Sequence, residues 1–356
     1  MVRTSIDCCV MLRASFRLGW CVLVGLAGLP ACGGCEGSRA PDPLATTPPA
    51  SATASATGRA SASATPSAAV EPAGWRVDAG PAPARIVAIG DLHGDLAATR
   101  KVLRLAGAID AKDAWSGGKL VVVQTGDAVD RGDDDRAILD LLERLKGEAA
   151  KAGGELVAMS GNHEIMQASF DFRYVTPPSF GSFADVKPKN DGVAAALQHI
   201  DAPARGRAAA FAPGGPYAVI IAKRPVIHRV GDTVFVHGGV LPKHVRFGID
   251  RINQETAAWL LGEKSEPPTP LGQEDGPLWT RMYSAAPGRE ECAMLAETLR
   301  LLGAKRMVMG HTPQKPSISP ACDAKGWRID VGMSKFYGGP IQALAIEGDV
   351  VTVLKE

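Results

Sequence analysis

The sequence predicts an α/β fold, because short apolar runs alternate with amphipathic stretches from residue 85 onward. Apolar runs at residues 85–90, 120–123 and 155–159 have the length and composition of buried strands. Apolar residues recur at helical spacing over residues 96–105 and 134–152, between successive runs. Strands that alternate with helices form βαβ units, which predicts a sheet that is covered on both faces.

The C-terminal half adds further strands to this pattern. Apolar runs predict strands at residues 233–236 and 306–309. The tail has two alternating segments, 342–346 and 350–354, joined by a Gly-Asp pair that is typical of a hairpin turn. Residues 164–230 show poor periodicity and frequent Pro and Gly, so we interpret them as an insertion or cap on the main fold.

The N-terminus has the pattern of an export signal. Arginines precede an apolar run at residues 18–29, which is too short to span a bilayer but has the length of a signal-peptide core. The run ends in Leu-Pro-Ala-Cys, which resembles the bacterial lipobox. We therefore expect a lipoprotein-type signal at residues 1–31 and acylation of Cys32. An ordinary cleaved signal is the alternative, and translation could start at Met1 or at Met11.

Residues 32–80 consist mainly of Ala, Ser, Thr and Pro. Because such a composition cannot bury enough apolar surface to offset the entropy of ordering, we predict a disordered linker ahead of a folded domain at residues 81–356. With Cys32 acylated, the protein would be lipid-anchored in the cell envelope on the periplasmic side. Gly33 follows the cysteine where an Asp would favour retention, which predicts the outer membrane. A secreted or periplasmic protein is the alternative.

Charge and cysteine content narrow the class of protein. The chain has 39 Lys and Arg against 38 Asp and Glu, so it lacks the basic excess of a nucleic-acid binder and we expect no nucleic-acid partner. Beyond the N-terminal segment the only cysteines are Cys292 and Cys322. They would form one disulfide in a domain outside the cytoplasm, or stay as two buried thiols, and the sequence favours neither.

Five segments place polar residues just beyond the ends of predicted strands. They lie at residues 90–95, 126–132, 161–164, 236–239 and 310–312. Ligands of open α/β sheets bind at the carboxyl ends of the strands, so the five segments are expected to converge on one site. Their Asp, His and Asn side chains suit Mn, Fe or Zn, and they are numerous enough for two ions with one bridging carboxylate. Paired metal ions are the usual apparatus for hydrolysing phosphate esters.

These motifs resemble those of the phosphoprotein phosphatase superfamily of calcineurin-like metallophosphoesterases. The resemblance rests on the series Gly-Asp-x-His-Gly, Gly-Asp-x-x-Asp-Arg-Gly and Gly-Asn-His-Glu. Segments similar to the Shewanella-like, or bacterial-type, phosphatases lie at residues 172–176, 276–281, 330–334 and 337–339. The resemblance covers about residues 86–354. It implies a β-sandwich flanked by helices, a metallophosphoesterase catalytic domain over residues 81–356, and two divalent or trivalent metal ions (Mn, Fe or Zn).

The same resemblance implies roles for individual residues. The metal ligands would be Asp91, His93, Asp127, Asn162, His237 and His311. Asp127 would bridge the two ions, and His163, oriented by Asp130, would be the catalytic acid. The phosphate would be bound by Arg131, Arg281 and Asn162. These roles agree with the chemistry, because an imidazolium can protonate a leaving group near neutral pH and a guanidinium fork matches phosphate oxygens.

The leading hypothesis is a phosphatase acting on phosphoserine, phosphothreonine or phosphotyrosine in proteins. A dinucleoside polyphosphatase or another small-phosphoester hydrolase is the alternative within this class. A surface binding module without catalysis is an alternative of a different class. Such a module is expected to have lost the acid or a ligand, whereas His163, Asp130 and all six ligands are present here. The expected partners are a phosphorylated substrate and, through the lipid anchor, a membrane.

Several other polar residues are not expected to belong to the site. His199, His228 and His244 are not predicted to be ligands, and His244 is expected in a surface loop after Pro-Lys. Three consecutive aspartates at residues 133–135 begin a predicted helix, where negative charge favours the helix dipole. Trp259 is expected on the core face of a helix.

Overall fold

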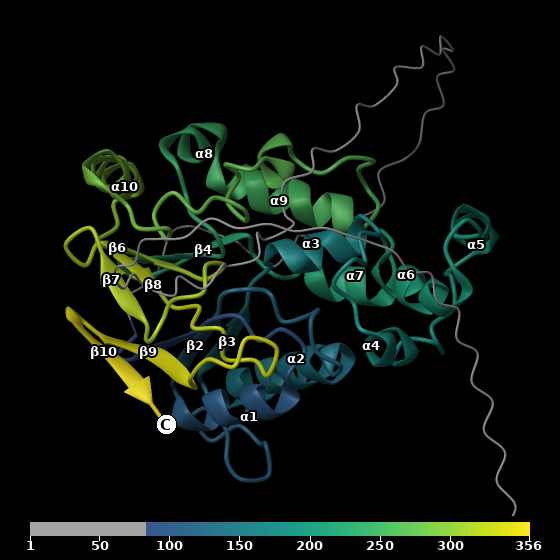
Figure 1. The fold of residues 1–356 in the computed structure, drawn as a ribbon, viewed down its shortest axis with the longest axis horizontal. Coiled ribbons are helices and arrows are strands. Elements are labelled where there is room, and N and C mark those ends of the chain that lie inside the picture. Colours follow the sequence, from purple (N-terminus) through teal and green to yellow (C-terminus); the bar gives the residue numbers. More distant parts are fainter. Residues whose placement is uncertain (1–82) are drawn as a thin grey trace, which may run out of the picture. The chain divides into compact units, whose positions relative to one another are not determined.

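The computed structural model of the protein describes residues 83–356, which belong to one compact unit (Figure 1). The predicted signal peptide, the acylated Cys32 and the linker at residues 32–80 lie outside these residues and stay predictions. Within residues 83–356, no helix is both long and apolar enough to cross a membrane.

The first sheet contains the three strands that the N-terminal half predicts. Its order is β10-β9-β1-β2-β3. The strands are β1 Ile86–Ile89, β2 Val121–Gln124, β3 Glu155–Ala158, β9 Gln342–Glu347 and β10 Val350–Lys355. Strands β1, β2 and β3 are parallel to one another, and the antiparallel pair β9–β10 confirms the predicted hairpin. Strand β9 then pairs antiparallel with β1 and completes a mixed sheet.

The second sheet combines predicted strands with strands that the sequence did not reveal. Its order is β4-β5-β6-β8-β7. The strands are β4 Ile227–Val230, β5 Thr233–Val236, β6 Arg306–Met309, β7 Ser319–Ala321 and β8 Gly326–Arg328. Strands β5 and β6 are where the apolar runs predict them. Strands β4, β7 and β8 have only three or four residues and are partly exposed, so their periodicity is too weak to detect.

Helices flank the two sheets. Helices α1 Leu96–Leu105 and α2 Asp135–Lys151 lie beside the first sheet (Figure 1). Helices α8 Pro242–Phe247, α9 Ile249–Leu260 and α10 Arg289–Leu302 lie beside the second. Buried apolar side chains from both sheets form one contiguous core. The result is the helix-flanked β-sandwich that the family resemblance implies, rather than one sheet covered by helices on both faces.

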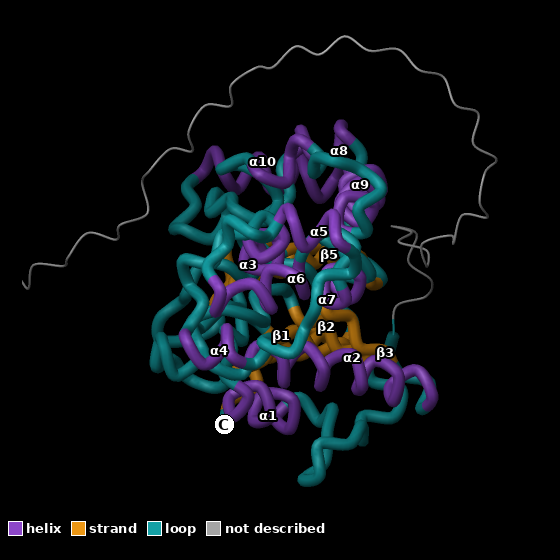
Figure 2. Tube along the Cα trace, turned by 90° about the vertical axis from the view of Figure 1, so that its right-hand side faces the viewer, coloured by secondary structure: helices purple, strands orange, loops and turns teal. Residues whose placement is uncertain are grey.

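The segment between β3 and β4 folds into short helices. They are α3 Asn162–Ala168, α4 Pro177–Gly181, α5 Asp191–Ala196, α6 Arg205–Phe211 and α7 Pro216–Ile221, with a 3-10 turn at Ala202–Ala204. Both views place α3, α6 and α7 on the opposite side of the first sheet from α1 (Figures 1 and 2). We call residues 177–221 the cap segment. Its helices have five to seven residues, too few for a clear helical period, which explains why the sequence shows none.

Candidate active site

The five predicted motifs converge at the carboxyl ends of the strands. Asp91 follows β1, Asp127 follows β2, and Asn162 follows β3, while β5 and β6 lead to the two remaining motifs. The six predicted ligand side chains are all buried, with at most 8% exposure. They are Asp91, His93, Asp127, Asn162, His237 and His311. Residues that are up to 220 positions apart in sequence are therefore neighbours in one polar cluster.

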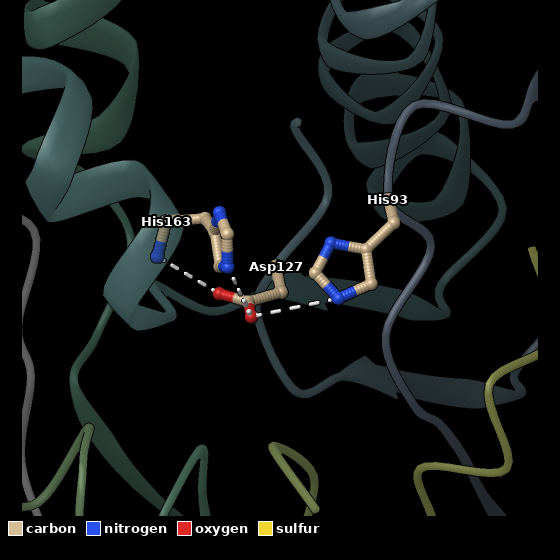
Figure 3. A group of neighbouring side chains, drawn as sticks. All are labelled: His93, Asp127 and His163. Carbon is tan, nitrogen blue, oxygen red and sulfur yellow. Dashed lines mark hydrogen bonds and ion pairs between the residues drawn. The ribbon is translucent and has the colours of Figure 1, made fainter. Parts of the chain in front are cut away.

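The Asp127 carboxylate lies at the centre of this cluster. Its Oδ2 atom is 3.2 Å from Nε2 of His237 and 3.8 Å from Nε2 of His93. Nε2 of His163 lies 3.7 Å from the same oxygen, and the backbone N–H of His163 donates to Oδ1 at 3.0 Å (Figure 3). Burial by itself raises the pKa of Asp127, but the neighbouring imidazoles of His237 and His163 hold it well below its usual range.

The remaining predicted ligands contact one another next to Asp127. Oδ1 of Asn162 lies 2.9 Å from Nε2 of His237, and Nδ1 of His311 lies 3.2 Å from that same nitrogen. Both carboxylate oxygens of Asp91 accept the backbone N–H of His311 at 3.2 Å. Burial and the neighbouring Asp330 carboxylate raise the pKa of Asp91 well above its usual value.

This donor set fits a pair of metal ions. Two groups of potential ligand atoms, each within 4.8 Å of one another, share Asp127: one with His93 and His163, the other with His237 and His311. Nδ1 of His93 lies 3.2 Å from the carbonyl oxygen of Val129, and Nδ1 of His237 lies 3.0 Å from that of Thr125. With Nδ1–H donating to a carbonyl, the Nε2 lone pair of each ring faces Asp127, as in histidine metal ligands.

The backbone at this site is strained. Five predicted site residues have left-handed backbone angles, with φ between 44° and 71°. They are His93, Asp127, Asp130, Arg131 and His311. Each left-handed non-glycine residue costs on the order of 1 kcal/mol, and such residues cluster where function requires a particular side-chain direction.

Glycines let the motif backbones approach one another. A Cβ at Gly161 would collide with the Asp127 carboxylate, and a Cβ at Gly310 would lie 2.5 Å from Oδ1 of Asp91. The Gly residues that precede Asn162 and His311 are therefore required for close approach of one motif to the next.

Glu164, the last residue of the Gly-Asn-His-Glu motif, holds two motifs together. Its carboxylate accepts the backbone N–H groups of Asp127, Ala128 and Gly161 at 2.7–2.9 Å. The side chain is fully buried, and burial together with the nearby Asp127 charge raises its pKa. The sequence places Glu164 in the motif but indicates no role for it.

The predicted acid and its partner lie in direct contact. Nδ1 of His163 is 2.6 Å from Oδ2 of Asp130, and both side chains are buried. Gln167 donates to both Asp130 oxygens at 2.9 and 3.0 Å. With Nδ1 occupied by Asp130, only Nε2 of His163 faces the polar cluster. That nitrogen has the geometry of a proton donor or of a further metal ligand.

Both predicted phosphate-binding arginines lie at the cluster. Nη1 of Arg131 is 2.8 Å from Nε2 of His93. Nη1 of Arg281 donates to the carbonyl oxygen of His311 at 3.0 Å and to Oγ1 of Thr312 at 3.1 Å. The two guanidinium groups thus come from distant segments, and each contacts a different predicted metal ligand.

Three aromatic rings surround Arg131, and none of them is a site residue that the sequence predicts. Its guanidinium carbon lies 4.8 Å from the ring centre of Tyr174, 5.2 Å from Tyr337 and 5.8 Å from Phe336. We call Tyr174, Phe336 and Tyr337 the aromatic collar. Tyr174 and Tyr337 belong to segments that carry the family resemblance, which was the available signal, whereas nothing marks Phe336.

The residues that were not expected to belong to the site are only partly where the sequence predicts them. Among the described residues, the metal-ligand groups contain neither His199, His228 nor His244, in agreement with the analysis. The expectation that His244 lies in a surface loop is wrong: it is buried in α8, where its Nδ1 accepts the N–H of Leu241. Trp259 is buried in α9 as expected.

Asp135 has a second role besides its predicted interaction with the helix dipole. It is the first residue of α2 and is fully buried. Its Oδ1 accepts the backbone N–H of Asp130 at 2.9 Å. One of the three consecutive aspartates at residues 133–135 therefore helps to hold an active-site residue in place.

The fold and the converging polar cluster define a metal-dependent phosphoester hydrolase, and comparison with known proteins agrees. Residues 84–315 match the model of the family described as calcineurin-like phosphoesterase. The chain belongs to this family, within the branch of the Shewanella-like protein phosphatases.

Two relatives carry the name of that branch. Shewanella-like protein phosphatase 2 of Arabidopsis thaliana is 42% identical over 282 residues, which cover 71% of this chain and 72% of the relative. Shewanella-like protein phosphatase 1 of Plasmodium berghei is 31% identical over 72% of this chain and 69% of its own length. The solved structure of a cold-active protein-tyrosine phosphatase from a psychrophilic Shewanella shares the fold, with a TM-score of 0.61, 22% identity, and coverage of 78% of this chain and 81% of that one.

Proposed function

We propose that this protein is a protein phosphatase whose preferred substrate is phosphotyrosine. The observation that supports this proposal is the aromatic collar around Arg131. Phe336 is 62% exposed, so part of its ring is open to a substrate. The ring of a phosphotyrosine whose phosphate reaches Arg131 can stack against the collar, whereas the short side chain of phosphoserine cannot. A phosphatase that shares the fold is named as acting on protein tyrosine.

The proposed mechanism divides the work among the described residues. Two ions of Mn, Fe or Zn type would be held by His93, Asp127, His237 and His311, whose ligand atoms lie in the two groups that share Asp127, together with Asp91 and Asn162. When bound, such ions supply a nucleophile from water at neutral pH and neutralise charge on the phosphate. Arg131 and Arg281 bind the phosphate oxygens and hold the ester in line for attack.

Protonation of the leaving substrate oxygen is assigned to His163 and Asp130. Nε2 of His163 faces the cluster, so an imidazolium proton at this nitrogen can pass to the leaving oxygen. Asp130 accepts from Nδ1 and stabilises the charged ring before transfer. A phenolate needs this proton less than a serine alkoxide, which leads to a testable difference between substrates.

The first experiment compares substrates. The purified protein with Mn²⁺ should hydrolyse a phosphotyrosine peptide with a kcat/KM at least about tenfold above that of the matched phosphoserine and phosphothreonine peptides, about 1.4 kcal/mol of discrimination. Phe336→Leu should reduce this ratio, because it removes the exposed ring and keeps an apolar side chain. Leu301→Ala, at an exposed apolar residue of α10, is the control and should leave the ratio unchanged.

The same assay decides between the alternatives. Faster hydrolysis of a dinucleoside polyphosphate than of any phosphopeptide would replace the protein-phosphatase proposal with the small-phosphoester alternative. No turnover even of p-nitrophenyl phosphate, in protein that binds metal, would favour a surface binding module. Equal kcat/KM values for the three phosphopeptides would contradict the assignment of the aromatic collar.

A further inference from the structure

A fully buried arginine joins the cap segment to the predicted catalytic pair. Arg207 lies on α6, and its side chain has no exposed surface. Its Nε donates to Oε1 of Gln167 at 2.7 Å, and its Nη1 donates to Oγ of Ser179 at 2.9 Å. Its Nη2 donates to Oδ2 of Asp135 at 2.7 Å and to Oδ1 of Asp130 at 3.4 Å. All three nitrogens of the guanidinium group therefore have partners.

The surroundings of Arg207 leave it little freedom to move. Its guanidinium carbon lies 5.0 Å from the ring centre of Phe183 and 5.1 Å from that of Phe211. A buried charge is costly unless it is paired and hydrogen-bonded, so the position of Arg207 depends on its carboxylate partners and theirs depends on it. Burial raises the pKa of Asp135 to about 6, although the charge of Arg207 opposes the rise.

The contacts of Arg207 converge on Asp130. Gln167 accepts from Arg207 and donates to both Asp130 oxygens, and Asp135 accepts from Arg207 and from the backbone N–H of Asp130. Both the carboxylate and the backbone of Asp130 are thus held by groups that Arg207 orients. The only remaining side-chain partner of the Asp130 carboxylate among the described residues is His163.

The geometry points to Arg207 as a positioning residue. We propose that it holds Asp130, and through Asp130 the His163 ring, in the direction that proton delivery requires. Because Arg207 and Ser179 come from the cap segment while Asp130 and His163 follow β2 and β3, docking of the cap segment completes the active site. This inference rests on the proposed role of His163 as proton donor.

Arg207→Lys in the full-length protein tests the inference. Lysine keeps the charge but cannot make the forked contacts of a guanidinium group. Turnover of a phosphoserine peptide should fall by about 10–100-fold, part of the usual worth of a general acid. The loss on p-nitrophenyl phosphate should be much smaller, because nitrophenolate leaves without a proton. KM and the metal content should not change, since Arg207 is expected to contact neither substrate nor metal.

A double variant distinguishes positioning from a general effect on the fold. If Arg207 acts through His163, then adding Arg207→Lys to His163→Asn should cause almost no further loss of turnover. Arg136→Lys is the matched control. Arg136 also ties the cap segment to α2, through Ser182, Asp185 and Tyr217, but does not contact Asp130. It should keep the wild-type ratio between the two substrates.

The outcomes separate this inference from the proposed function. If His163→Asn shows no dependence on the leaving group, the role of His163 is wrong and the inference falls with it. Two results would overturn only the inference, provided that His163→Asn does show that dependence. One is an equal loss of turnover on both substrates in Arg207→Lys. The other is a double variant in which the losses of turnover from Arg207→Lys and His163→Asn add in full. Should Arg207→Lys not fold, Gln167→Met decides by the same two criteria, since it removes the hydrogen bonds that connect Arg207 to Asp130 through Gln167 without changing a charge.

Discussion

Adjacent side chains of this site face different partners. Asn162 and His163 are the first two residues of α3, and successive helical residues point about 100° apart. Oδ1 of Asn162 therefore meets His237, whereas Nδ1 of His163 meets Asp130. This separation predicts that metal binding and proton transfer can be removed independently by mutation.

His163→Asn should keep two metal ions and lower turnover by roughly 10²–10⁴-fold, the usual contribution of a general acid. The loss should be greater for phosphoserine than for p-nitrophenyl phosphate, because only the serine alkoxide needs the proton. Elemental analysis and kinetics on both substrates provide the measurement. Asp127→Asn is the contrasting variant and should lose both ions and all activity, since both ligand groups share Asp127.

Two results would contradict this assignment. Loss of metal from His163→Asn would mean that Nε2 is a ligand, as the group of His93, Asp127 and His163 would also allow. A wild-type protein that binds a single ion after reconstitution would remove the two-metal proposal, whatever the kinetics of the variants.

At the scale of elements, a disulfide ties a helix to a turn. The structure joins Cys292 of α10 to Cys322, which lies in the turn between β7 and β8, with a Cα–Cα distance of 5.1 Å. The residues at positions 322–324 all have left-handed backbone angles. A link across 30 residues to such a strained turn is expected to stabilise the fold, mainly by restricting the unfolded chain.

The double variant Cys292→Ser, Cys322→Ser should lower the free energy of unfolding by about 3 kcal/mol. Urea unfolding of the oxidised protein, the reduced protein and the double variant measures this difference, and the reduced protein should behave like the variant. Peptide mapping without reductant checks the link itself. Free thiols in protein taken from its native envelope would show that the two half-buried cysteines are reduced instead.

At the scale of the whole molecule, the predicted lipid anchor would decide where the enzyme works. We propose that Cys32 is acylated and that the linker at residues 32–80 separates the catalytic domain from a membrane. If these 49 residues behave as a flexible coil, they would span roughly 35–42 Å. Substrates would then be phosphorylated proteins or peptides within that reach in the cell envelope.

Membrane fractionation of cells that express the protein tests the anchor. The wild type should sediment with membranes, and Cys32→Ala should be found in the soluble fraction, because it loses the acylation site. If the wild type is soluble too, the signal is an ordinary cleaved one and the anchor does not exist.

The sequence by itself located most of the main strands and the active-site motifs. Runs such as 120–123 are buried on both faces, so their apolar composition is visible without knowledge of their neighbours. The polar residues that follow, Asp127 among them, lie at strand ends by virtue of local sequence alone. The contact between His163 and Asp130 was implied only by the resemblance of their motifs to a known family, because local patterns do not show which distant residues meet.

Only the tertiary structure revealed what supports and surrounds these motifs. Arg207 comes from a helix of seven residues in a segment without periodicity, and its partners lie 28 to 77 positions away. Phe336 contacts Arg131 although the two residues are 205 positions apart in sequence. The buried His244 was misplaced for a related reason, since the helix that carries it, α8, packs against α10, which lies far along the chain. Periodicity reports only how a segment divides its own side chains between core and solvent, whereas these contacts exist only once distant segments have packed together.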